Sequence, residues 1–461
     1  MFPPFPEDEA YRLCKKIAKS LEENEIRIEH MGRISEERAG AGIMIGALIC
    51  TDKDGKKVNL ASLSGTSRKF VSDSPTADSI QDSIQDSIQG FIPVPCIVPP
   101  EKIDAALEKN DAEIHRLTRV LEEETDAEKR NEILRERKKL TDESLAKVHA
   151  LYSFRCIDGT QKSLTEICRK RGIGLPPTGT GECAEVKLLH YAFENGLQPV
   201  SMAEMYWGKS TAKKECGKIY PPCDERCALI LPEMLGLEII YRDSSIVVVN
   251  KQSGLLSIPG RTEDKKDCIT SRLKRLFPEC IDQPAVHRLD METSGLMVLA
   301  LTKDAHRKLS MDFEQGKVKK EYEALLDGIL AKKGIAQQGC MELYFRLDVD
   351  NRPHQIWDEV YGKKAITEWK ILNVETFTTR QGERRNATRV RFIPHTGRTH
   401  QLRLASADPH GFGIPIIGDS LYGPNPEKAA DESRLLLHAA YLSFTHPETG
   451  ETMIFESPCP F

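Results

Sequence analysis

The stretch from Ala285 to Lys303, AVHRLDMETSGLMVLALTK, combines charged side chains with a run that should be buried. Arg288 and Asp290 stand two residues apart, shortly before the apolar run from Leu296 to Leu301, which is typical of a fully buried strand. A carboxylate anchored beside such a strand can lie at the floor of a cleft, where it can act as a nucleophile or accept a proton. The structural alternative is a turn carboxylate that caps a helix beginning at Thr302 or binds nearby backbone amides.

Three blocks downstream of this stretch also place reactive side chains beside apolar runs. They are KKEYEALL, PHTGRTHQLRL and PIIGDSLYG, at 319–326, 394–404 and 415–423. In this order after HRLD, the blocks resemble the RluA family of pseudouridine synthases, enzymes that isomerise uridine in structured RNA. The resemblance runs from Leu235 to Phe461 and includes NKQSGLLSIPGR before HRLD and RLLLHAAYLSFTHP near the end. Within the family, DNRPHQIWDEVYGKKAITEW at 350–369 resembles the branch that gives the family its name.

This resemblance implies a chemical role for four side chains. Uridine isomerisation breaks the bond between C1′ and N1, turns the freed uracil and joins C5 to C1′, and a carboxylate can serve it as nucleophile or base. The resemblance implies that Asp290 is that carboxylate and that Arg403 is the cation paired with it. It also implies that Arg288 inserts into the RNA where the uridine has flipped out, and that Tyr322 stacks on the extruded ring. Without the motif, Tyr322 would be taken for a buried strand tyrosine. The isomerisation should need no cofactor.

Three further side chains in these blocks are candidate RNA contacts. His287 stands in the HRLD motif itself, beside the residue expected to enter the RNA. Arg398 and His400 stand two residues apart on a predicted strand, so we expect both to project from one face toward phosphate or sugar. The alternatives are simple solubility for Arg398 and a core hydrogen bond for His400. After Arg403 the chain departs from the family pattern with Leu404-Ala405 and the insertion SADPHGFG, which should alter the local loop and the fit of the substrate.

Two groups in the same half are expected to be structural. The GDSLYG block, with Gly418, Asp419, Tyr422 and Gly423, resembles a turn that packs under the site. His438 lies in the apolar stripe LLLHAAYLSF, where a histidine is more often satisfied in the core than catalytic.

Composition limits the classes of protein to which the chain can belong. With 461 residues it should form two or three domains. Its net charge of -5 lacks the basic excess typical of a nucleic-acid binder, so RNA must meet a local patch. Such a patch is present from Arg384 to Arg403, which holds six arginines, two histidines and no acid. Thirteen cysteines with no signal peptide indicate reduced thiols and a cytoplasmic protein, and the apolar run from Ala39 to Cys50 is too short to span a membrane.

The N-terminal half should open with a helix and a hairpin. Apolar residues repeat at helical spacing over Glu7 to Glu23, and Ile43 to Leu63 is typical of two strands joined by the turn Asp52 to Gly55. Three tandem copies of DSIQ, from Asp78 to Gln89, have no period that buries a face and are interpreted as a loop insertion.

A helical hairpin should follow. Apolar residues fall at heptad spacing from Ile103 to Leu121, with Asn110 as one polar member, and a return helix is predicted after Glu124 to Asp126. The predicted antiparallel hairpin is either an arm that grips RNA or a second subunit, or a solvated insertion.

Beyond the hairpin, three cysteines are spaced like metal ligands. Cys183-Ala184-Glu185 opens a predicted helix, and Cys223 and Cys227 follow at least 40 positions later. With the early helix and hairpin, this order is similar to the cytidine-deaminase-like fold, which implies zinc on Cys183, Cys223 and Cys227 with Glu185 as the acid/base group. The final pair is C-x-x-x-C where that family has C-x-x-C, and buried structural cysteines are the alternative. The Gly-rich start of the region, PPTGTG, lacks the Lys-Ser/Thr of a phosphate loop, so no nucleotide cofactor is expected.

Together these features predict an α+β protein. A mixed, mainly antiparallel-sheet pseudouridine synthase domain at 235–461 should follow an α/β accessory domain at 1–100 and 151–234, into which the coiled-coil hairpin at 101–150 is inserted. Leu229 to Tyr241 is interpreted as the linker. The predicted function is isomerisation of specific uridines in ribosomal RNA, transfer RNA or both, with RNA as the partner and no membrane association. Two alternatives remain, namely a bifunctional enzyme with an N-terminal zinc pyrimidine deaminase, and a non-catalytic RNA-binding or ribosome-assembly factor.

Overall fold

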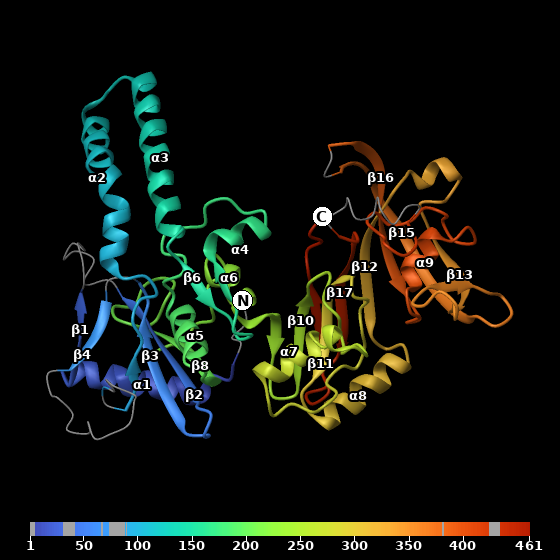
Figure 1. Cartoon of the computed structure of the whole chain (residues 1–461), viewed down its shortest axis with the longest axis horizontal. Coiled ribbons are helices and arrows are strands. Elements are labelled where there is room, and N and C mark those ends of the chain that lie inside the picture. The colour runs from blue at the N-terminus through green and yellow to red at the C-terminus, as the bar shows by residue number, and fades with distance from the viewer. Residues whose placement is uncertain are drawn as a thin grey trace. The chain divides into compact units, whose positions relative to one another are not determined.

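The computed structural model describes residues 5–30, 42–65, 68–72, 88, 90–379, 382–423 and 434–461. The chain divides into two compact units, Met1–Glu238 and Ile239–Phe461 (Figure 1). The predicted DSIQ insertion falls, apart from Ile88, outside the described residues. Within the described ranges, every helix is too short or too polar to cross a membrane.

The first unit is built on a four-stranded sheet with a helix on each face. Its strands lie in the order β5 (Ile92–Pro93), β3 (Lys57–Leu63), β2 (Ile43–Thr51) and β8 (Gln198–Trp207). Alternate side chains of β2 pack against α1 (Asp8–Glu22), whereas Gly46 on the opposite face lies so close to α5 (Ala184–Glu194) that a Cβ there would come within 2.6 Å of the Ala184 methyl group. The predicted opening helix and hairpin correspond to α1, β2 and β3.

Smaller elements complete this unit. They are the antiparallel pair β1 (Ile26–His30) and β4 (Arg68–Ser72), the pair β6 (Ser153–Arg155) and β7 (Gln161–Ser163), and the helices α4 (Leu164–Lys170) and α6 (Cys227–Leu235).

The predicted helical hairpin consists of α2 (Pro100–Glu123) and α3 (Ala127–His149), which lie side by side and extend away from the sheet (Figure 1). Asp126 caps α3 by accepting the backbone N–H groups of Glu128 and Lys129. The polar heptad member Asn110 is buried and donates its amide to Ser144 Oγ at 3.1 Å and to the Leu140 carbonyl at 3.3 Å. A buried amide with these partners fixes the register of one helix on the other.

The predicted linker at Leu229–Tyr241 contains the boundary between the two units but is not an irregular connection. Helix α6 covers most of this stretch, and β9 (Glu238–Arg242) follows it after one turn. Ile230, Leu231 and Met234 are fully buried, and Pro232 lies inside the helix. The segment is therefore part of a packed core.

The second unit is a mixed α+β domain around a ten-stranded sheet, as predicted. The strand order is β14-β13-β15-β16-β12-β17-β11-β10-β9, with β18 paired to β17. The bounds are β10 (Ile246–Lys251), β11 (Ser294–Ala300), β12 (Lys319–Leu326), β13 (Gln338–Leu347), β14 (Gln355–Trp357), β15 (Lys363–Thr378), β16 (Arg384–Pro394), β17 (Leu437–Thr445) and β18 (Thr452–Glu456). The helices are α7 (Ile269–Leu276), α8 (Lys303–Glu314) and α9 (Gln401–Ala407).

Strand β17, from the end of the chain, lies in the middle of this sheet between β12 and β11. It runs antiparallel to β12 and parallel to β11, where Gly295 faces Ala439. A Cβ on Gly295 would come within 2.3 Å of the Ala439 carbonyl oxygen, and its φ of +117° is one that residues with side chains rarely adopt. This glycine allows the two strands to approach.

Candidate active site

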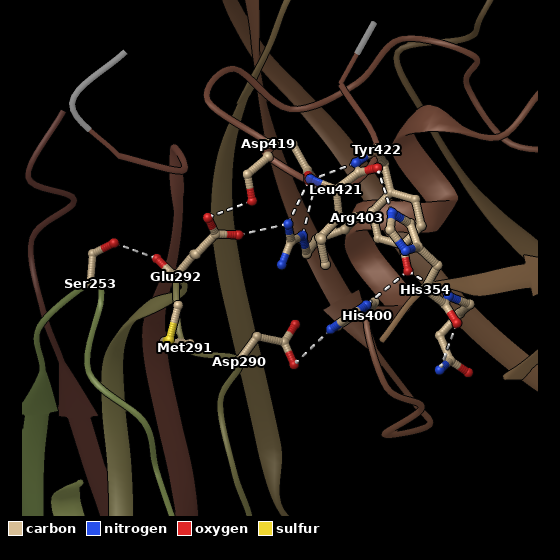
Figure 2. A network of polar contacts seen from close by, with 12 residues as sticks. Ser253, Asp290, Met291, Glu292, His354, His400, Arg403, Asp419, Leu421 and Tyr422 are labelled. Carbon is tan, nitrogen blue, oxygen red and sulfur yellow. Dashed lines mark hydrogen bonds and ion pairs between the residues drawn. The ribbon is translucent and has the colours of Figure 1, made fainter. Parts of the chain in front are cut away.

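Asp290 lies in a loop that leads into β11 and lines a cleft of about 920 Å³. Its side chain is 19% exposed, and its carboxylate accepts no hydrogen bond from any described residue. His400 Nε2 lies 4.0 Å from Asp290 Oδ1 (Figure 2). A partly desolvated carboxylate with free lone pairs is available to a substrate.

The Asp290 loop is held from beneath by the end of β10 and the segment that follows. Lys251 is buried and its Nζ donates to the carbonyls of Leu255 at 2.6 Å and Met291 at 2.8 Å. Burial lowers the pKa of Lys251 to about 7, against the opposing effect of the Asp290 charge. Ser257 Oγ donates to the Leu289 carbonyl at 2.6 Å and accepts its N–H at 3.0 Å.

Lys251 and Ser257 were not among the predicted site residues. Both belong to the block NKQSGLLSIPGR, which was recognised only as part of the resemblance. Its fixed place before HRLD was the one signal that could have pointed to them. The block forms the support of the reactive loop.

Arg288 and His287 have opposite environments although they are adjacent. Arg288 is exposed, lines the cleft and has no hydrogen bond or ion pair within the described ranges. His287 instead accepts the Val298 N–H at its Nε2, at 3.1 Å, and stacks on Phe313 with ring centroids 4.4 Å apart. Burial and nearby Lys320 lower the pKa of His287 to about 3, so the ring is neutral. These contacts make His287 a support of the loop; it also lines the cleft, and its contact with RNA stays a prediction.

Tyr322 on β12 projects into the cleft that contains Asp290. Its hydroxyl has no hydrogen-bond partner among the described residues. Burial raises the pKa of Tyr322, and the Asp290 charge raises it further. The phenol is therefore protonated at neutral pH and can donate to a ligand in the cleft.

The predicted ion pair between Arg403 and Asp290 is wrong. Arg403 is 2% exposed, and its Nε donates to Asp419 Oδ2 at 2.9 Å while its Nη2 donates to Asp419 Oδ1 at 2.5 Å and to Glu292 Oε2 at 2.7 Å (Figure 2). Burial alone would lower the pKa of Arg403, but the Asp419 hydrogen bonds and charge, with Glu292 and Asp290, outweigh burial and raise it. Asp290 thus acts on Arg403 as a nearby charge and not as a bonded partner.

Arg398 and His400 do not lie on a strand. β16 ends at Pro394, and His400, with a φ of 55°, is the residue before α9. The exposed Arg398 donates its Nε to the Lys364 carbonyl at 2.9 Å and lines the cleft. The two side chains therefore leave a turn in different directions, and only Arg398 lies at the surface where RNA could reach it.

His400 is buried between Asp290 and the GDSLYG turn. Its Nδ1 shares a 2.8 Å hydrogen bond with the Tyr422 hydroxyl, and burial lowers its pKa while the Asp290 charge opposes that shift. The turn is fixed by Asp419, whose Oδ1 accepts the N–H groups of Leu421 and Tyr422. This is the structural turn under the site that the sequence indicated.

His438 is a satisfied core histidine, as expected. Its Nδ1 bonds Ser294 Oγ at 2.8 Å and its Nε2 bonds Ser457 Oγ at 3.1 Å. Burial lowers the pKa of His438 to about 4.

In the first unit, the structure brings the three predicted thiols together. The Sγ atoms of Cys183, Cys223 and Cys227 all lie within 4.8 Å of one another, at 4.0 Å for Cys183 to Cys223 and 3.6 Å for Cys223 to Cys227. Cys183 precedes α5 and Cys227 begins α6, so the turn before α6 folds Cys223 back onto it despite the extra residue in C-x-x-x-C. Glu185 is 2% exposed, and its Oε2 has no hydrogen-bond partner among the described residues. Glu204 Oε1 accepts the Glu185 N–H at 3.2 Å.

A family model described as RNA pseudouridylate synthase matches residues 245–408, inside the second unit. The chain is 43% identical over 225 residues to the dual-specificity RNA pseudouridine synthase RluA of Haemophilus influenzae. The matched residues cover 49% of this chain and 94% of that protein. It is 41% identical over 230 residues to the protein of the same name from Escherichia coli K12, with 50% and 96% covered. The solved structure of human RNA pseudouridylate synthase domain containing 1 aligns with 28% identity and a TM-score of 0.39, over 49% of this chain and 84% of that chain.

The two bacterial relatives are matched over almost their whole length, which shows the family. Isomerisation is the reaction that the family name describes, and RNA is its substrate. The chain belongs to the RluA family of RNA pseudouridine synthases.

Proposed function

We propose that this enzyme isomerises specific uridines in ribosomal RNA, transfer RNA or both, with Asp290 as its catalytic carboxylate. One observation carries the proposal, namely that the Asp290 carboxylate lies in the cleft with no hydrogen bond from any described residue. The bacterial relatives are named dual-specificity enzymes, which supports action on more than one RNA.

The chemistry assigns distinct roles to the side chains of the cleft. The bond from C1′ to N1 breaks, C1′ bonds to C5 of the turned uracil, the C5 proton leaves and N1 gains a proton. Asp290 serves these steps either by bonding to C1′ or by accepting the C5 proton, and both roles require an ionised carboxylate free of partners. Tyr322 contacts the flipped base, with its hydroxyl available for proton transfer. Arg403 holds the wall of the site through Asp419 and Glu292.

The RNA itself is held by the cationic side chains at the mouth of the cleft. Arg288 and Arg398 are exposed and both line the cleft. An arginine at the Arg288 position can fill the gap left by the flipped uridine, since a planar guanidinium stacks on bases and bonds phosphates. Arg398 meets the neighbouring phosphate. These arginines and the exposed Lys319, which also lines the cleft, form a local cationic surface on a chain with net charge -5.

The experiment is tritium release from ribosomal and transfer RNA labelled at C5 of uridine. Asp290→Asn should lower the rate by at least about 1,000-fold without weakening RNA binding, as removal of a reacting group does. Asp304→Asn is the matched control, because that carboxylate is 87% exposed in α8 and does not line the cleft. Equal release by Asp290→Asn and the control would disprove the role of Asp290. No release by any form, with RNA binding retained, would favour a non-catalytic RNA-binding or assembly factor.

We propose a second function for the first unit, which is zinc binding by Cys183, Cys223 and Cys227. The donor set fits the ion, since zinc bound by thiolates at about 2.3 Å with tetrahedral angles places sulfurs about 3.8 Å apart. The observed Sγ separations of 4.0 and 3.6 Å bracket that spacing. Cys183 precedes α5, Cys227 begins α6 and Cys223 lies in the turn before α6, so two helix starts position the cluster.

Glu185 is the residue that we assign to proton transfer beside this ion. Its buried Oε2 lacks a hydrogen-bond partner within the described residues, a state that is costly without a function or an absent ligand. A zinc ion with three protein ligands keeps a fourth position for water or substrate. This arrangement supports a hydrolytic reaction such as pyrimidine deamination in the first unit.

Metal analysis of the purified full chain tests the assignment. We expect about one zinc per chain, and a loss of at least four-fifths of it in Cys223→Ser. Cys216→Ser is the control, because Cys216 is exposed and outside the cluster. Less than about 0.1 zinc per chain after purification without chelators would refute the site. We also expect tritium release to persist after chelation, since no step of the isomerisation uses a cofactor.

A further inference from the structure

The turn from Asp358 to Gly362, which joins β14 to β15, displays two large apolar side chains to solvent. Val360 and Tyr361 are each 78% exposed, more than any other large hydrophobic residue among those described. A single exposed apolar residue is ordinary. Two adjacent ones on a constrained turn, one of them aromatic, indicate a binding surface.

This turn is constrained by one carboxylate. Asp358 Oδ1 accepts the N–H groups of Val360 at 3.0 Å and Tyr361 at 2.9 Å, and the Asp358 carbonyl accepts the N–H of Gly362 at 2.9 Å. The other oxygen of Asp358 forms an ion pair with Arg346 on β13. The ion pair and the hydrogen bonds hold the pKa of Asp358 below its usual range, so the carboxylate stays ionised and the turn stays closed at neutral pH.

Gly362 adds a second constraint. A Cβ there would come within 2.2 Å of the Asp358 carbonyl oxygen and 2.7 Å of the Tyr344 backbone. The backbone therefore packs on itself beneath the two apolar side chains. Since the turn is preorganised, a ligand that binds Val360 and Tyr361 loses little free energy in ordering it.

The turn is linked to the catalytic cleft through Lys364. Arg398 lines the cleft with Asp290, and its Nε donates to the Lys364 carbonyl at 2.9 Å. Lys364 follows Tyr361 by three residues, a length of chain that spans at most about 11 Å.

Charges around the turn favour stacking over a phosphate clamp. Glu359 and Lys363 are both exposed, so the turn itself is nearly neutral, and Lys364 forms an ion pair with Glu342 at 2.7 Å. An aromatic ring with little net charge around it suits the π-face of a base, which every nucleotide offers when it is unpaired. The cation that would hold the phosphate of the same strand is Arg398.

We propose that Tyr361, with Val360 beside it, is a stacking platform for an unpaired base that flanks the target uridine. Flipping a uridine out of its stack leaves neighbouring bases exposed, and an aromatic side chain on a turn linked to the cleft stabilises that open form. The inference rests on the proposed function for its RNA ligand and names a specificity-determining residue for it.

Binding and kinetics of three variants test this platform. Tyr361→Ala should raise both the Kd and the KM for the modified RNA by at least about fivefold, because base stacking of this kind spans about 5- to 150-fold in affinity. The turnover number at saturating RNA should change by less than twofold. Tyr361→Phe should restore wild-type values, because the ring and not the hydroxyl makes the contact. Ile454→Ala, which removes a side chain 58% exposed on β18, should leave Kd and KM unchanged.

A spectroscopic readout separates stacking from a structural effect. In Tyr361→Trp, titration with RNA should quench the fluorescence of the added indole, because a base stacks on it. RNA with an abasic site at the flanking position should leave that fluorescence unquenched. Equal Kd values for Tyr361→Ala and Ile454→Ala would overturn the inference. So would a loss of stability or a change in sedimentation of Tyr361→Ala without RNA, since Tyr361 would then pack on protein. If the wild type released no tritium but Tyr361→Ala still weakened RNA binding, the proposed function would fail while the platform stood.

Discussion

Replacing Arg403 by methionine should destabilise the second unit as a whole. Arg403 and Asp419 are 2% and 1% exposed, and two hydrogen bonds join them. The variant would leave the Asp419 carboxylate buried with only the N–H groups of Leu421 and Tyr422, and Glu292 with the Ser420 hydroxyl. Removing one partner of a buried pair costs about 3–5 kcal/mol, so we expect a loss of that size in the free energy of unfolding.

The double variant, Arg403→Met with Asp419→Asn, decides whether the loss in the free energy of unfolding comes from the broken pair or from the missing cation alone. Asp419→Asn alone should cost about 2–4 kcal/mol, since Arg403 then keeps only Glu292. In Arg403→Met with Asp419→Asn, no buried charge remains unpaired, so the combined loss should fall short of the sum by at least about 2 kcal/mol. In the wild type, the pKa of Arg403 lies above its usual range. Arg403 therefore stays charged from pH 5 to pH 9, and its titration does not change the coupling energy with Asp419 in that range.

The assay is urea unfolding followed by tryptophan fluorescence in a Trp207→Phe background. Trp357 and Trp369 both lie in the second unit, so the remaining signal reports that unit alone. Additive losses would refute the reasoning. So would an Arg403→Met variant within about 0.5 kcal/mol of the parent that has lost only its turnover, because Arg403 would then act on the reaction and not on the fold.

Three further predictions follow from the same geometry. Gly295→Ala should prevent the second unit from folding, as judged by its cooperative thermal transition, whereas Gly316→Ala, with a φ of 68° and nothing within 4 Å of an added Cβ, should cost about 1 kcal/mol. His438 has a folded pKa of about 4 against 6.5 unfolded, so its contribution is full above pH 6.5 and is lost as the pH falls toward 4. Relative to His438→Asn, the wild type should lose roughly 3 kcal/mol between pH 7 and pH 4 in urea titrations, and parallel curves would contradict this. Tyr322→Phe should lower the turnover number by about 100-fold with KM nearly unchanged, and an equal rise in KM would indicate a binding role instead.

Local patterns in the sequence were sufficient to predict helices and strands where the period of the apolar residues agrees with their burial. The apolar runs of β10 and β11 are typical of buried strands. The spacing of apolar residues in α2 and α3 predicted the helical hairpin, with Asn110 at its seam. HRLD and the tyrosine of KKEYEALL were placed around one cleft, with the turn GDSLYG packed on its Arg403, because the order of these blocks resembles a family. These are features that short stretches of residues determine.

The wrong predictions came from contacts between distant residues. Arg403 could have paired with any of several acids, and its partner Asp419 is 16 residues away while Glu292 is 111 away. Arg398 and His400 were predicted on a strand, yet β16 ends at Pro394 and α9 begins at Gln401, where Leu404 and Ala405 belong to one buried cluster with Leu343 of β13. Most of the predicted linker forms α6, where eight buried residues offset the hydrogen bond that Pro232 cannot make.

The position of β17 has a consequence for how the enzyme is made. Strands β10 and β11 carry the Asp290 loop, β12 carries Tyr322, and β17, the strand that joins them, follows all three along the chain. A chain that ends before Leu437 holds two half-sheets whose inner edges have no partner, and the acid and the phenol belong to different halves. Because chains emerge from the N-terminus onward, premature termination gives a product with no assembled cleft. Activity therefore requires synthesis to proceed beyond β17.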